Sequence, residues 1–62
     1  MWIEITDIHF GNMLINLENV TSVSASDCYT RIDFVNGHCT AKENYEHMKM
    51  KIFSEIHRRN NG

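Results

Sequence analysis

The sequence contains no proline, and its three glycines stand apart from one another. No linker or low-complexity stretch marks an internal boundary. Isolated glycines also fail to form a glycine-rich phosphate-binding loop, so nucleotide triphosphate chemistry is not indicated. We therefore expect residues 1–62 to form a single domain, because a chain of this length holds only one hydrophobic core.

Cysteine and long apolar runs are equally scarce. Cys28 and Cys39 are the only cysteines and lack the CxxC spacing, so they are too few for a disulfide framework. No run approaches the roughly 18 apolar residues of a membrane span. The first residues carry no basic region and include Glu4, which is unlike a secretory signal. We expect a cytoplasmic protein with reduced thiols and no membrane contact.

Positive charge is also limited, with six Lys and Arg residues against eight Asp and Glu residues. The net charge of −2 provides no field that attracts a phosphate backbone, which argues against a nucleic-acid partner. Hydrophobic residues make up 42% of the chain, a proportion typical of folded domains. A core this small contributes little stability alone, so we also expect a homo-oligomer.

Apolar alternation and turn residues predict an α+β fold. The fold is a small antiparallel β-meander of four to five short strands within residues 1–42, followed by one C-terminal amphipathic helix at about 44–59. In the first strand a period of two places Ile3 and Ile5 on the core face. A further meander strand spans residues 29–35 and has the clearest alternation in the chain.

The dipeptide Asn36-Gly37 predicts a two-residue type I′ hairpin turn, because both residues tolerate positive φ. Counting outward pairs Val35 with His38 and Ile32 with Ala41. One face of this hairpin then collects apolar residues, two large and two small: Ile32, Phe34, Cys39 and Ala41. Their sizes leave a shallow trough in which a helix can lie.

The helix that fills this trough has a predicted cap at Asn44. Four residues at helical spacing form its core stripe: Tyr45, Met48, Ile52 and Ile56. Met50 and Phe53 lie outside that stripe, with Glu46 and His57 beside them. Exposed apolar side chains often mark contact surfaces, so we expect Met50, Phe53 and His57 to meet another subunit or partner. The alternative is a tilted helix whose Phe53 is covered by the curled sheet.

Two further sets of residues are candidates for binding. Trp2 and Tyr29 occupy outward strand positions and can form an aromatic contact surface. Arg31, His38 and Lys42 lie on the outward face of the last hairpin, where an oligomer could bind a small anion or nucleotide.

Catalytic and metal-binding patterns are weak. The four histidines are His9, His38, His47 and His57, and their spacing is not that of metal ligands. No local signature supports a cysteine, histidine and aspartate arrangement around Cys28. We expect no enzyme activity, no cofactor and no metal.

Several segments resemble the short flagellar proteins called FlbD and similar small proteins of bacteria and phages. They are residues 15–20, the strand 31–34, the turn 35–37 and the segment 42–46. The resemblance implies a non-enzymatic accessory or regulatory role exerted through protein contact.

The leading functional prediction is a non-catalytic regulator or inhibitor that occupies a surface of a larger protein partner. A phage-encoded inhibitor of a bacterial defence system would fit the size and acidity of the chain. The alternatives are an oligomeric module that sequesters a small anion or nucleotide, and a flagellar accessory protein.

Overall fold

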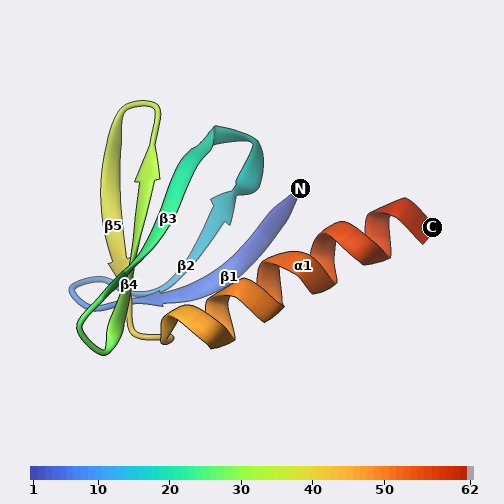
Figure 1. The fold of residues 1–62 in the computed structure, drawn as a ribbon. Coiled ribbons are helices and arrows are strands. Elements are labelled where there is room, and N and C mark those ends of the chain that lie inside the picture. The colour runs from blue at the N-terminus through green and yellow to red at the C-terminus, as the bar shows by residue number, and fades with distance from the viewer. Residues whose placement is uncertain (62) are drawn as a thin grey trace.

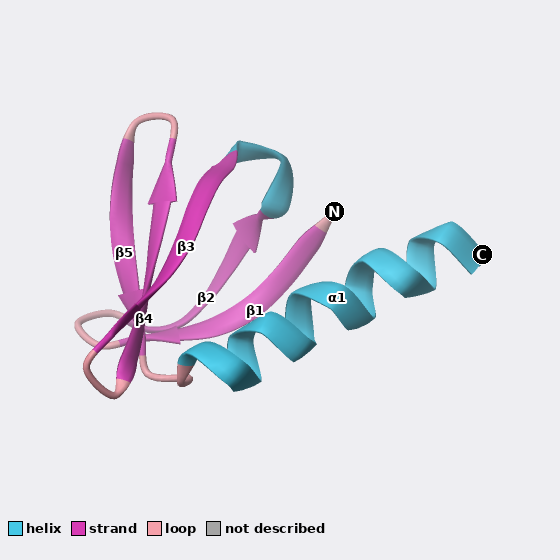
Figure 2. Ribbon diagram, viewed as in Figure 1, coloured by secondary structure: helices cyan, strands magenta, loops and turns pink. Residues whose placement is uncertain are grey.

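The computed structural model describes the backbone of residues 1–61 and the side chains of residues 1–58. Five strands precede one helix (Figures 1 and 2). The strands are β1 (Trp2–Asp7), β2 (Gly11–Asn16), β3 (Val20–Ser26), β4 (Tyr29–Phe34) and β5 (Gly37–Ala41). A short 3-10 helix, η1 (Leu17–Asn19), joins β2 to β3, and α1 (Tyr45–Asn61) ends the chain. The predicted α+β class, meander and C-terminal helix are confirmed.

The five strands form one antiparallel sheet in the order β2-β1-β5-β4-β3. Consecutive strands β3, β4 and β5 are neighbours, and the β1–β2 hairpin joins this group through β1. The junction between β1 and β5 is short, because its strand pairing is limited to Asp7 with Ala41. In Figure 1, β1 and β2 diverge from β4 and β5 away from this junction. The edge strands are therefore β2 and β3.

The β4–β5 hairpin has a different turn from the one predicted. Phe34 pairs with Gly37, so Val35 and Asn36 are the turn residues. Asp27 is the one non-glycine residue of the described backbone with a positive φ, which means that Asn36 does not adopt the type I′ conformation. Gly37, at φ 151°, takes up the backbone conformation that favours glycine.

The predicted register is consequently wrong by two residues. Ile32 pairs with Cys39 instead of Ala41, and Ala41 pairs with Thr30. A shift of two preserves which face each side chain occupies, because side chains alternate with a period of two. The predicted apolar face therefore survives, with Ile32 and Ala41 fully buried. Since Ala41 also pairs with Asp7 of β1, β5 is paired on both sides, and its register must satisfy both neighbours.

The core combines both hairpins and the helix. Its buried apolar residues come from four strands and α1: Ile3, Ile5, Ile15, Ile32, Ala41 and Met48. Ile3 and Ile5 face inward as their alternation predicted. Phe34 and Cys39 are only partly buried at the margin of this core, because the sheet opens toward that end.

The helix begins as predicted but leaves the core before it ends. The Asn44 side-chain oxygen accepts a hydrogen bond from the His47 N–H at 2.8 Å and caps the first turn. Met48 is fully buried, and Ile52 packs against the core margin. Ile56, the last residue of the predicted stripe, remains 38% exposed. Figure 1 shows the reason, because the C-terminal half of α1 extends beyond the strands.

Candidate protein-binding surfaces

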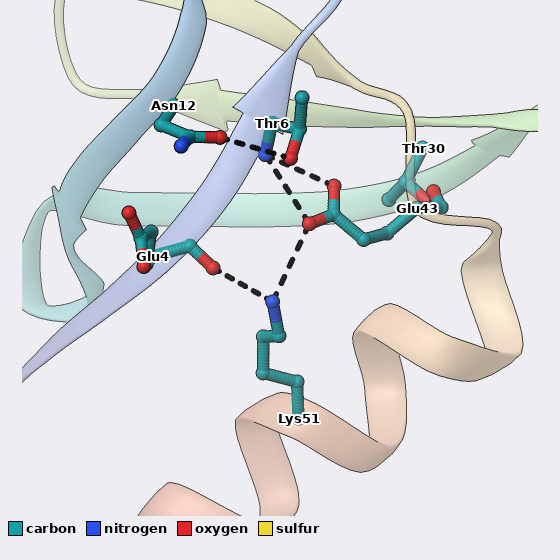
Figure 3. Close-up of polar contacts among 6 residues, drawn as sticks. All are labelled: Glu4, Thr6, Asn12, Thr30, Glu43 and Lys51. Carbon is teal, nitrogen blue, oxygen red and sulfur yellow. Dashed lines mark hydrogen bonds and ion pairs between the residues drawn. The ribbon is translucent and has the colours of Figure 1, made fainter.

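A polar junction fixes α1 against β1 where that strand separates from β5 (Figure 3). The last backbone hydrogen bond between β1 and the segment that follows β5 runs from the Lys42 N–H to the Thr6 carbonyl at 2.7 Å. Beyond it, the Glu43 carboxylate accepts the Thr6 N–H at 3.1 and 3.2 Å. The Lys51 ammonium donates to the Glu4 carbonyl at 2.7 Å and lies 3.4 Å from Glu43. Two side chains thus replace the missing strand partner of β1.

The same junction reaches into β4 through Thr30. Its hydroxyl, fully buried, donates to the Glu43 carbonyl at 2.7 Å. Burial raises the pKa of the Glu43 carboxyl, but the N–H groups of Glu43 and Thr6 and the Lys51 ammonium outweigh burial and lower the pKa overall. The carboxylate is therefore charged at neutral pH. Sequence reasoning missed Glu43, Thr30 and Lys51, because their shared site forms only when α1 lies beside β1.

Asp7 organises the other side of the β1–β5 junction. Its carboxylate accepts the His9 N–H at 2.8 Å and the Phe10 N–H at 2.9 Å. The hydrogen bond from His9 is the main reason that the pKa of Asp7 lies below its ordinary value. This buried carboxylate holds the β1–β2 turn in place and leaves Phe10 at the surface, 82% exposed.

An apolar groove of about 470 Å³ runs along the open side of β2. We call it the edge groove. Its walls come from β1, β2, η1, the end of β4 and the β4–β5 turn: Trp2, Met13, Leu14, Ile15, Asn16, Asn19, Phe34, Val35 and Asn36. Trp2, Leu14 and Val35 are each at least 60% exposed. The groove therefore combines large accessible apolar side chains with an unpaired strand edge.

A second apolar groove lies between β3 and α1, and we call it the helix groove. It consists of two adjoining depressions of about 200 and 260 Å³ that share Val23 and Ile52. One is bordered by Tyr45, Lys49 and Phe53. The other is bordered by residues near the chain start and the end of the core stripe: Met1, Leu17, Glu18, Val20 and Ile56. The groove exists because the helix diverges from the sheet after Met48.

The five predicted contact residues lie in different places. Trp2 lines the edge groove, whereas Phe53 borders the helix groove. Met50 and His57 are exposed on α1 next to Phe53 in the helical projection. Tyr29 lies at the start of β4, paired with Ser26. Phe53 is 60% exposed, so the alternative in which the sheet covers it is wrong.

The predicted anion-binding residues do share the outward face of β4 and β5. The register places Arg31 opposite Thr40 and His38 opposite Asp33, with Lys42 just beyond β5. Asp33 lies beside two of them, however, because it pairs with His38 and accepts a hydrogen bond from the Arg31 guanidinium at 3.1 Å. That bond is the main cause of a lowered pKa at Asp33. An incoming anion would meet the Asp33 carboxylate and compete with it for Arg31.

The lining of a third hollow, of about 370 Å³, includes Asp7, His9, His38 and Cys39. Burial, with a smaller effect from the charge of Asp7, raises the pKa of the Cys39 thiol. An activated nucleophile needs the opposite shift. Among the residues that the structure describes, no group of three or more His, Cys, Asp or Glu side chains is arranged to hold a metal ion.

Fold and surface together define a small antiparallel α+β protein with two apolar grooves. Comparison with protein-family models, with curated proteins and with solved structures found no match to this chain. No helix in the described part of the chain is both long and apolar enough to cross a membrane.

Proposed function

We propose that this protein is a non-catalytic regulator or inhibitor that binds a larger protein partner through the edge groove. The carrying observation is the exposure of Trp2, Leu14 and Val35 beside the unpaired edge of β2. Apolar clusters of this kind on small domains are typical of interaction surfaces. The partner supplies an extended segment that pairs with β2 and places apolar side chains in the groove.

The β2 edge suits this role better than the β3 edge. Alternate N–H and C=O groups of β2 point away from β1 and can hydrogen-bond to an added strand. The β3 sequence is rich in small polar residues, including Ser22, Ser24 and Ser26, all exposed. Such residues give an added strand little apolar area to bury. The β2 edge therefore offers an added strand both backbone hydrogen bonds and apolar side chains to contact.

Anion sequestration, the alternative from a different functional class, has weaker support. Two of its three basic residues, Arg31 and His38, lie beside the Asp33 carboxylate, which already accepts a hydrogen bond from Arg31. The resemblance to FlbD-like flagellar proteins stays a prediction, and it agrees with a role exerted through protein contact.

The proposal is tested by affinity capture with three full-length baits followed by hydrogen exchange. A specific partner retained by wild type is expected to be lost by the double variant Trp2→Ser, Leu14→Ser. Phe53→Glu, which changes a different exposed site, should retain it. In the complex, the amides of residues 13–16 should gain protection from exchange, because a new strand covers them.

Equal partner recovery by wild type and the double variant would contradict the edge groove as the binding site. Protection confined to α1 would contradict it as well. Circular dichroism of each bait controls for unfolding, which we do not expect because the substituted side chains are more than half exposed.

A further inference from the structure

Four side chains form an exposed strip along α1 that faces neither the core nor the edge groove. The strip consists of Glu46, Met50, Phe53 and His57, all of which are exposed. Their spacing of four, three and four residues confines them to about 60° of the helix circumference and about 16 Å of its length. This spacing is that of a two-helix seam, in which apolar residues alternate at intervals of three and four. The strip therefore has the geometry of a helix-pairing surface.

The strip is chemically complementary to itself when two copies run antiparallel. A two-fold axis between positions 51 and 52 places Met50 opposite Phe53 of a second copy, and Phe53 opposite its Met50. The same axis places each Glu46 opposite a His57. The thioether then contacts an aromatic ring, a favourable pairing, and an acid lies opposite a basic side chain at both ends.

A parallel pair lacks this complementarity. It places Glu46 against Glu46 and His57 against His57, so the like-charged carboxylates repel each other. We infer that α1 of one chain pairs antiparallel with α1 of a second chain through Glu46, Met50, Phe53 and His57.

The residues that flank the strip are compatible with close approach. Lys49 lies 3.6 Å from Glu46 on its own helix and 5.8 Å from the centre of the Tyr45 ring. Pairing also covers Phe53, whose ring is 60% exposed in a single chain. A 62-residue domain gains from this burial, because its own core is small.

The test is the mass of the full-length protein in solution, measured by light scattering and analytical ultracentrifugation. Wild type is expected to dimerise at or below about 1 mM, the weak limit for a useful association. Phe53→Glu should weaken dimerisation by more than about tenfold, because the central apolar contact is lost twice. Phe10→Glu, a matched change of an exposed phenylalanine in the β1–β2 turn, should leave the dissociation constant within about twofold.

A charge exchange then tests the direction of pairing. Glu46→Lys alone should weaken the dimer, because it removes the carboxylate that lies opposite the His57 imidazole of the partner copy. Adding His57→Glu should restore it, since the introduced lysine of each copy then faces the introduced glutamate of the other. In a parallel pair the double exchange would restore nothing.

Three results would overturn the inference. They are a wild-type chain that stays monomeric at about 1 mM, a dimer that is indifferent to Phe53→Glu, and a double exchange that stays as weak as Glu46→Lys. This inference is independent of the partner bound at the edge groove, because the two surfaces share no residue. Loss of dimerisation with retained partner binding, or the reverse, therefore separates the two proposals.

Discussion

The two halves of α1 use the same helical periodicity for different purposes. In the first half, Met48 is fully buried and Lys51 donates to the backbone of β1. In the second half, Phe53 and Ile56 remain exposed, although Ile56 continues the apolar stripe of Met48 and Ile52. The difference arises because the sheet is shorter than the helix (Figure 1). An apolar stripe shows which side of a helix can be buried, but the length of its support decides how much of it is buried.

The largest effect expected from this comparison comes from the buried half. Met48→Ala should lower the free energy of unfolding by about 2–5 kcal/mol, because it removes a core side chain and leaves a cavity. Ile56→Ala should cost less than about 1 kcal/mol, since its side chain keeps much of its contact with water. Urea denaturation at a protein concentration where the chain is monomeric measures both. Equal losses would show that the two halves are buried alike.

The polar junction gives the next largest effect. Glu43→Ala should destabilise the fold by about 1–3 kcal/mol, because the Thr6 N–H and the Lys51 ammonium lose their shared acceptor. Glu43→Gln keeps one acceptor oxygen at the same position and should cost less. The control is Glu46→Ala in the same monomeric conditions, since that side chain is exposed on α1. A Glu43→Ala variant as stable as Glu46→Ala would mean that the junction contributes nothing.

The smallest effect is a dependence of stability on acid pH. The folded-state pKa of Glu43 lies below its ordinary value of 4.5. In acid, this carboxyl group is therefore protonated to a smaller extent in the folded chain than in the unfolded chain. Its stabilising contribution is complete above pH about 4.5 and is lost as pH falls through the lowered pKa. Asp7 acts in the same direction.

Denaturation curves between neutral and acid pH check this expectation. Wild type should lose stability on acidification more steeply than Glu43→Gln, and the variant should retain the part that Asp7 contributes. Parallel pH profiles for the two proteins would contradict the assigned role of Glu43.

Local signals in the sequence predicted local structure well. Alternation around Ile3 and Ile5 identified a strand and its buried face, and Asn44 identified the start of the helix. The hairpin turn was predicted one residue too late, which shifts the pairing by two, because Asn36-Gly37 alone does not specify how β5 pairs with the rest of the sheet. The residues that we propose for interfaces were partly recognisable, since Met50 and Phe53 fall outside the core stripe. Leu14 and Val35 were not, because the edge groove joins segments distant in the sequence.

The sequence by itself determined the order of the elements, the buried face of each strand and the cap of α1, because these depend on residues within a few positions of one another. Only the tertiary structure decided the pairing of β1 with β5, the register of β5 and the positions of Glu43 and Lys51. It also decided which part of α1 stays exposed. These features depend on contacts between residues more than 30 positions apart, such as Thr6 with Glu43, and no short pattern encodes such a contact.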